Sequence, residues 1–297
     1  MLKKVLNLHE EVVNERLKSA CEEHGAQVYA KVRVADVLPI ENSGISNEEY
    51  SFALKSHFDF LVTDGEHNPL FAVEFDGPSH ESGTQVDRDA VKNRLAERFD
   101  LPLLRVRSSH LLRRYDGWDL LTWIVDVWFL QQEADRMYAE DQLPYDFDFD
   151  PAFIISSPGH KRRFPYWLGL DAQLKIQELH KGGRVIDMAP STYQGVDKDE
   201  NLRAFAFIRL DQATGVRVSA AMRSQRFRLD LSEPMRGVLF NDLLHELEQA
   251  LRDSSRRVPL QQIDAEIKQF ASRYKMLSWC GYAPPGARDI ARRPTSR

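Results

Sequence analysis

Residues 57–107 are HFDFLVTDGEHNPLFAVEFDGPSHESGTQVDRDAVKNRLAERFDLPLLRVR, and this stretch decides the fold of the chain. Two apolar runs, 58–62 and 70–76, are separated by a short polar turn and are typical of neighbouring strands. Successive side chains of a strand point to opposite faces, so Glu74 and Asp76 share one face. The sequence therefore predicts a sheet that carries two acids on one face of a single strand.

A third carboxylate lies on the first of these runs. Asp59 stands between Phe58 and Phe60, a setting that favours a metal ligand over an acid that only caps a hairpin. Asp59, Glu74 and Asp76 would repel one another without a cation, and hard divalent ions prefer a shell of oxygen ligands. We therefore expect these three residues to bind Mg²⁺ or Mn²⁺, and we expect the protein to be a metal-dependent nuclease.

The elements around the site follow from hydrophobic periodicity. They are, in chain order, a helix, three strands, a helix, a strand and an apolar helix: 4–24, 26–37, 58–62, 70–76, 85–99, 101–107 and 120–137. This order predicts an α/β domain with a mixed sheet.

Proline-rich and acidic residues after this domain mark a boundary. We expect the α/β domain to span 1–143 and a linker to span 144–158. A second, α+β domain is expected at 159–283, and its role is the binding of nucleic acid or of a protein partner. The Arg- and Pro-rich tail, 284–297, is expected to be mobile.

The motifs of the first domain resemble those of a known nuclease superfamily. Asp59 and the tripeptide 74–76 resemble the PD-(D/E)XK pattern. Gly77-x-x-His80 and the strand ending 103–106 make the chain most similar to the branch of very-short-patch-repair-like endonucleases. The resemblance covers roughly residues 5–110.

This resemblance implies a restriction-endonuclease-like mixed sheet flanked by helices. It also implies that Asp59 and Glu74 bind the metal, with the main-chain carbonyl of Phe75 in the shell. Glu10 would match the glutamate that these enzymes carry on their first helix. A buried structural acid is the alternative interpretation of Glu10.

The chain departs from the family pattern at position 76, where a lysine is replaced by Asp76. Phosphoryl transfer depends on positioning and electrostatic stabilisation, so a cationic group is still needed. Lys92 on the following helix and His80 are the candidates, and His80 could also act as acid or base. Arg105 is the next candidate if neither acts. The alternative is an inactive nuclease fold that serves as a nucleic-acid-binding or assembly module.

Charge divides the chain into two unlike halves. Residues 1–150 carry 16 Lys and Arg against 29 Asp and Glu, whereas residues 151–297 carry 24 against 16. Lys161, Arg162 and Arg163 precede several aromatic residues, as on surfaces that contact phosphates and stack on bases. These residues predict contact with DNA, and RNA is an alternative substrate. A protein-partner or homo-oligomer surface, or a solvated face, is the competing interpretation.

Composition limits the class of protein. The chain is 42% hydrophobic and 29% charged, which is ordinary for a soluble globular protein. No apolar stretch approaches the roughly 20 residues of a membrane helix. Cys21 and Cys280 are far apart in the sequence, which indicates a reducing cytoplasm and no disulfide framework. Repair, restriction and phage defence all remain candidate settings for such a nuclease.

Overall fold

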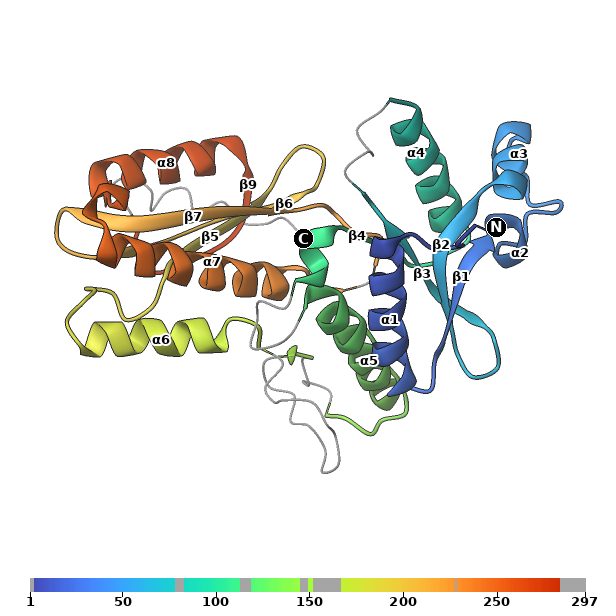
Figure 1. Cartoon of the computed structure of the whole chain (residues 1–297), viewed down its shortest axis with the longest axis horizontal. Helices are drawn as coiled ribbons and strands as arrows, with labels where there is room; N and C mark the ends of the chain where they lie inside the picture. Colours follow the sequence, from blue (N-terminus) through green and yellow to red (C-terminus); the bar gives the residue numbers. More distant parts are fainter. Residues whose placement is uncertain are drawn as a thin grey trace. The chain divides into compact units, whose positions relative to one another are not determined.

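The structure is a computed structural model of the whole chain, and it describes residues 3–77, 83–112, 119–144, 149–151, 167–227 and 229–283. The chain forms two compact units (Figure 1). The first comprises Met1–Arg113, Trp118–Asp150 and Gln225–Leu229, and the second comprises Arg114–Gly117, Pro151–Ser224 and Asp230–Arg297. The first unit therefore includes a short segment from the second half of the sequence, which the sequence pattern did not indicate.

The first unit is built on a four-stranded sheet of order β1-β2-β3-β4. Strands β1, β2 and β3 are antiparallel neighbours, and β4 is parallel to β3. A parallel neighbour requires a crossover, which here contains α4. The strands are β1 (Gln27–Arg33), β2 (His57–Thr63), β3 (Pro69–Phe75) and β4 (Leu103–Val106). The helices are α1 (Leu8–Glu22), α2 (Val34–Val37), α3 (Asn47–Lys55), α4 (Gly83–Arg98), η1 (Ser108–Leu111) and α5 (Leu120–Ala139). The expectation of a mixed α/β architecture is confirmed.

Helices cover both faces of this sheet. Phe71 of β3 packs against Trp128 of α5, with ring centroids 4.8 Å apart. The next residue, Ala72, points to the opposite face and shares a buried cluster with Leu95 of α4. Strand β3 is therefore buried on both sides, and any polar side chain on it must find a partner inside the protein.

Helix α1 begins with a capping box that also fixes a site residue. Asn7 accepts hydrogen bonds from the backbone N–H groups of His9 and Glu10, and Oε2 of Glu10 accepts one from Asn7 N. Such reciprocal capping sets the start of a helix. It occupies one carboxylate oxygen of Glu10 and leaves Oε1 to make other contacts.

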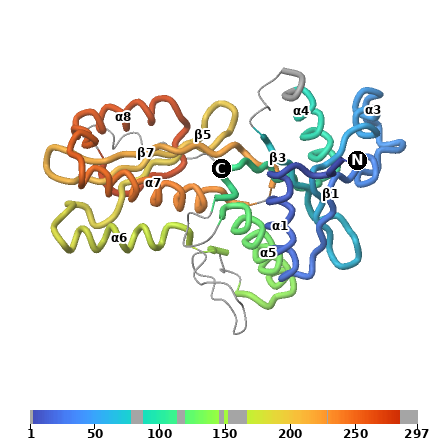
Figure 2. The backbone as a smooth tube through the Cα atoms, viewed as in Figure 1, coloured from blue at the N-terminus to red at the C-terminus, as the bar shows by residue number. Residues whose placement is uncertain are grey.

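The second unit contains a five-stranded antiparallel sheet of order β8-β7-β6-β5-β9. Its strands are β5 (Ser191–Val196), β6 (Leu202–Arg209), β7 (Thr214–Met222), β8 (Val258–Pro259) and β9 (Lys275–Cys280). Its helices are α6 (Leu170–Lys181), α7 (Ser232–Arg252), η3 (Ser254–Arg256) and α8 (Leu260–Arg273). Figure 2 traces the chain through the three long helices around this sheet.

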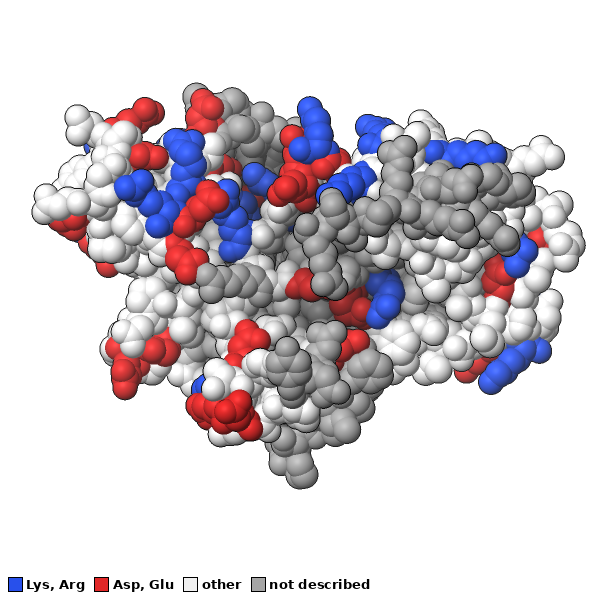
Figure 3. Space-filling view, turned by 180° about the vertical axis from the view of Figure 1, so that it is seen from behind, with Lys and Arg blue, Asp and Glu red and all other residues white. Residues whose placement is uncertain are grey.

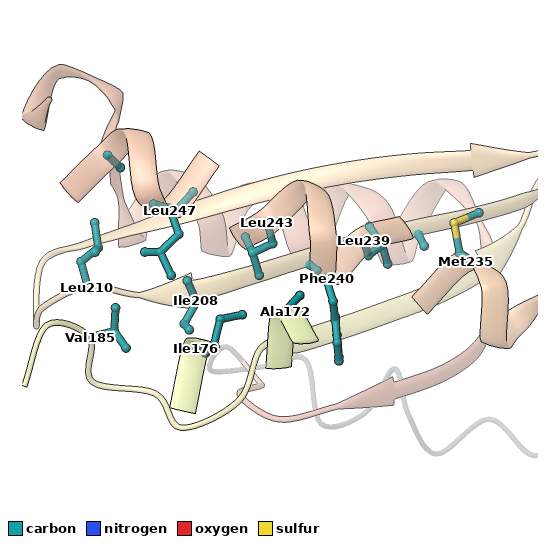
Figure 4. Packing of buried hydrophobic residues seen from close by; sticks show 14 of the residues in the cluster. Ala172, Ile176, Val185, Ile208, Leu210, Met235, Leu239, Phe240, Leu243 and Leu247 are labelled. Carbon is teal, nitrogen blue, oxygen red and sulfur yellow. The ribbon is translucent and has the colours of Figure 1, made fainter. Parts of the chain in front are cut away.

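Alternate residues of β6 supply two separate cores in the second unit. Ala206 and Ile208 join a cluster with α6 and α7, which Figure 4 shows from close by. Phe205 and Phe207 pack with Ile267 of α8. This strand is thus apolar on both faces. None of the described helices of either unit is long and apolar enough to cross a membrane.

Candidate active site

Four charged side chains lie at one level across the strands of the first sheet, and we call them the charged row: Lys31, Asp59, Glu74 and Arg105. Ala30 and Val32 of β1 pair with Phe60 and Phe58 of β2, so Lys31 lies beside Asp59. Phe60 pairs with Val73 of β3, and extending this register by one residue places Asp59 beside Glu74. Glu74 is paired in turn with Arg105 of β4. Two acids are therefore flanked by a basic residue on either side.

Both oxygens of Asp59 accept hydrogen bonds. Oδ1 accepts from Lys31 Nζ at 2.7 Å, and Oδ2 accepts from the backbone N of Phe75 at 2.9 Å. Lys31 Nζ also donates to Oε1 of Glu10 at 2.8 Å. Burial acts to lower the pKa of Lys31, but the bonds to Asp59 and Glu10 raise it above its ordinary value. The ammonium therefore stays charged and joins the two acids.

Lys31 has an uncommon backbone conformation. Its φ is +55°, in the left-handed region, although it lies inside a strand. This conformation is unfavourable for a residue with a side chain and is found at functional sites more often than elsewhere. No sequence motif of the first domain includes Lys31. The available signal was a lysine in the strand that pairs with the strand of Asp59.

Glu74 is the most unusual acid of the site, because it is buried and only partly hydrogen-bonded. It is 5% exposed, and its Oε2 accepts from Lys92 Nζ at 2.7 Å. No described residue donates a hydrogen bond to its Oε1, which is also buried. Burial raises the pKa of Glu74 to about 7 against the opposing effect of Lys92, and the charge of Asp59 raises it further. Glu74 therefore exchanges a proton near neutral pH.

Helix α4 brings Lys92 onto this acid. The ammonium of Lys92 is held between Oε2 of Glu74 and the main-chain oxygen of His57, to which it donates at 2.8 Å. It also lies 5.8 Å from the ring centroid of Phe58. The cation that the sequence placed on this helix thus contacts one of the two acids that the resemblance assigns to metal binding.

Asp76 has a different partner. Its Oδ1 accepts from Nη1 of Arg105 at 2.9 Å, and both side chains are buried. The guanidinium of Arg105 also donates to Oδ1 of Asn93 and forms an ion pair with Asp89. Where the PD-(D/E)XK pattern has a lysine, this chain has Asp76, whose charge is balanced by a buried arginine.

The structure does not gather the three expected carboxylates into one metal-ligating cluster. Within the described ranges, no group of three or more His, Cys, Asp and Glu side chains is close enough to hold an ion. Asp59 and Glu74 lie opposite each other, whereas Asp76 is turned to Arg105. The pair Asp59 and Glu74 nevertheless suits a hard cation, because Oε1 of Glu74 is an oxygen that lacks a donor from any described residue.

Several predicted site residues lie outside the described residues. They are His80 and the basic group Lys161, Arg162 and Arg163. In the described part of the second unit, arginines form ion pairs with acids: Arg203 with Asp197, Arg209 with Asp187, and Arg217 with Glu266. Figure 3 shows the molecule from behind, and there the groups of basic side chains with acidic side chains among them lie on the side of the first unit.

Comparison with protein families gives a match to the part of the chain that contains the site. A protein-family model described as "Protein of unknown function (DUF2726)" matches residues 2–115. This range contains the whole charged row together with Glu10, Asp76 and Lys92. No curated protein and no solved structure matches the chain.

Proposed function

We propose that the first unit is the catalytic part of a divalent-metal-dependent nuclease that hydrolyses phosphodiester bonds in DNA. The observation that carries this proposal is the buried Glu74, which faces Asp59 and has one oxygen without a described donor. Removing two charges from water costs several kcal/mol each, and an apolar pair of similar volume is often at least as stable. Acids with a shifted pKa in such a setting are candidates for chemistry.

The residues suit a metal of the expected kind. Asp59 and Glu74 would hold Mg²⁺ or Mn²⁺ through carboxylate oxygens, which both ions accept. Bound there, the ion would supply the positive charge that activates water and stabilises the phosphate. The resemblance to PD-(D/E)XK nucleases, carried by Asp59 and the tripeptide 74–76, supports the same assignment.

The basic residues of the site orient its acids and balance their negative charges. Lys92 orients Glu74 and places an ammonium beside it, the contribution that the family lysine would make from position 76. Lys31 holds Asp59 against Glu10, and Arg105 balances Asp76. Below about pH 7 a proton on Glu74 removes its negative charge, so it must be lost before the carboxylate binds a cation.

A second function is supported by a specific observation. Each acid of the predicted site already has a basic partner in the structure: Lys31 for Asp59, Lys92 for Glu74 and Arg105 for Asp76. A site whose charges balance internally can persist without a metal. This favours an inactive nuclease fold that binds nucleic acid or a protein partner as the alternative.

Cleavage assays with the full chain separate the two functions. Supercoiled plasmid, single-stranded DNA and RNA are incubated with Mg²⁺, with Mn²⁺ and with a chelator. We expect metal-dependent nicking of DNA, which Asp59→Ala removes and Asp187→Ala in the second unit leaves unchanged. DNA that is bound but never cut would support the binding module, and cleavage of RNA alone would reassign the substrate.

Metal binding has its own signature. Because Glu74 is partly protonated near pH 7, binding of Mg²⁺ should release protons. Calorimetry in buffers of different ionisation enthalpy measures this release. The Glu74→Gln variant should not show this release of protons. Absence of any binding at millimolar metal would contradict the metal site.

A further inference from the structure

The backbone of Arg105 forms hydrogen bonds with the side chain of Gln225, which lies 120 residues later in the sequence and is not part of the sheet. The backbone N of Arg105 donates to Oε1 of Gln225 at 3.0 Å, and Nε2 of Gln225 donates back to the backbone O of Arg105 at 3.3 Å. The amide of Gln225 therefore pairs with Arg105 as a neighbouring strand would. These contacts belong to the first unit, which includes Gln225–Leu229.

The two residues that follow Gln225 fix it in place. Leu103 N donates to the backbone O of Arg226 at 3.0 Å, and the two residues form an antiparallel bridge. Phe227 is 2% exposed and packs against Phe71, with ring centroids 5.1 Å apart. The segment is thus anchored by a backbone bond and a buried aromatic ring, and the position of the Gln225 amide follows from both.

Strand β4 needs such a partner. It is the last strand of its sheet, and the outward backbone groups of a last strand are left for water or for another chain. On its inner side β4 pairs with β3, as in the bond from Asp76 N to Val106 O. The outward groups of Arg105 are the ones that Gln225 satisfies.

We propose that Gln225 is a positioning residue that acts on Arg105 and, through it, on Asp76. Because the backbone N–H and C=O of Arg105 are both held by Gln225, its side chain starts from a fixed point from which the guanidinium reaches Asp76 and Asn93. The charge that balances Asp76 is therefore kept within the charged row. This inference rests on the proposed function only in treating that row as the nuclease site.

The test compares three variants of the full chain. Gln225→Met keeps the length of the side chain and removes both hydrogen bonds. Gln225→Glu keeps an acceptor for Arg105 N and removes the donor to Arg105 O. Gln262→Met is the matched control, because Gln262 is an exposed residue of α8 whose side-chain amide donates to Glu266.

Hydrogen exchange and NMR give readouts that do not depend on cleavage. In Gln225→Met the amide of Arg105 should exchange about five- to tenfold faster, since one hydrogen bond is lost. The guanidinium Nε–H resonance of Arg105 should shift, and Gln225→Glu should fall between Gln225→Met and wild type. Gln262→Met should leave both signals unchanged.

Cleavage then separates this inference from the proposed function. If the wild type cuts DNA, Gln225→Met should lower kcat and leave KM unchanged. If the wild type does not cut, the proposed function fails, while the exchange and guanidinium signals still decide the role of Gln225. Unchanged Arg105 signals in Gln225→Met would overturn the inference. If Gln225→Met does not fold, the same two signals in Gln225→Glu decide it.

Discussion

The inner strands β3 and β6 have similar surroundings and opposite chemistry. Both are buried between helices, and in β6 the residues from Ala204 to Ile208 are all apolar. In β3 the same degree of burial includes Glu74, with Asp76 directly after the strand. The second unit shows that a sheet in this chain is built without buried acids, so the acids of β3 are not required by the architecture.

Individual ion pairs of the two units can be compared by their burial. Asp187 with Arg209 and Asp197 with Arg203 lie at the ends of strands and are partly exposed, since the arginines are 29% and 35% exposed and the acids 12% and 13%. Exposed ion pairs contribute little to stability. The pair of Glu74 with Lys92 is almost fully buried, and there the loss of one partner leaves an uncompensated charge. The same kind of contact thus has different consequences in the two units.

The largest effect is expected on cleavage. Asp59→Ala or Glu74→Ala should lower DNA cleavage by about a thousandfold, since each removes a carboxylate that we propose as a metal ligand and a fixed charge at the site. Asp187→Ala removes a comparable acid from the second unit and should leave the rate unchanged. Steady-state kinetics on plasmid DNA measures both. If Asp187→Ala lowered the cleavage rate as much as Asp59→Ala does, cleavage would not depend specifically on the acids of the first unit.

The buried pair should show the next largest effect. Lys92→Met should destabilise the fold by about 3–5 kcal/mol, because Glu74 is left buried without its cation. The double variant Glu74→Leu with Lys92→Met makes β3 resemble β6 and should recover that stability, but not cleavage. Urea unfolding followed by circular dichroism measures these changes.

A matched substitution in the second unit completes this comparison. Arg203→Met breaks the peripheral pair with Asp197 and should change the free energy of unfolding by less than about 1 kcal/mol. If Arg203→Met and Lys92→Met were equally destabilising, burial would not be what separates the two pairs.

The pKa of Glu74 predicts a pH dependence of stability. Its folded pKa of about 7 lies above its ordinary value of 4.5, so between these values the folded state holds a proton that the unfolded state has lost. Stability should therefore fall as pH rises through this window, by up to about 3 kcal/mol, and level off above it. Glu74→Gln should remove this dependence. An unchanged pH profile in that variant would assign it to another group.

The smallest effect is expected from the basic residues of the second half. Replacing Lys161, Arg162 and Arg163 by Glu should weaken DNA binding and reduce the salt slope of log affinity by about two to three. The matched control replaces Lys175, Lys181 and Arg184, which are exposed residues of the second unit, by Glu. Fluorescence anisotropy across a salt series measures both. If both triple variants weakened DNA binding equally, the change in net charge alone would explain the loss, and the position of the basic residues would not matter.

Part of the site could be anticipated from local sequence. Alternation along β3 puts Glu74 and Asp76 on one face, and in the structure α4, the crossover between β3 and the parallel β4, covers that face. The contact of Lys92 with Glu74 follows from that helix. The expected strand 26–37 was too long, because β1 ends at Arg33 and a helical turn follows.

The sequence by itself determined the α/β class, the carboxylates of the strands and the helix that carries Lys92, because these depend on periods of two and of 3.6 residues. Only the tertiary structure decided which cation each acid meets. Lys31 reaches Asp59 through a left-handed backbone, and Arg105 is held by a glutamine 120 positions away. Such contacts join residues that are far apart in the sequence or depend on a single backbone angle, and no local pattern of residues encodes either.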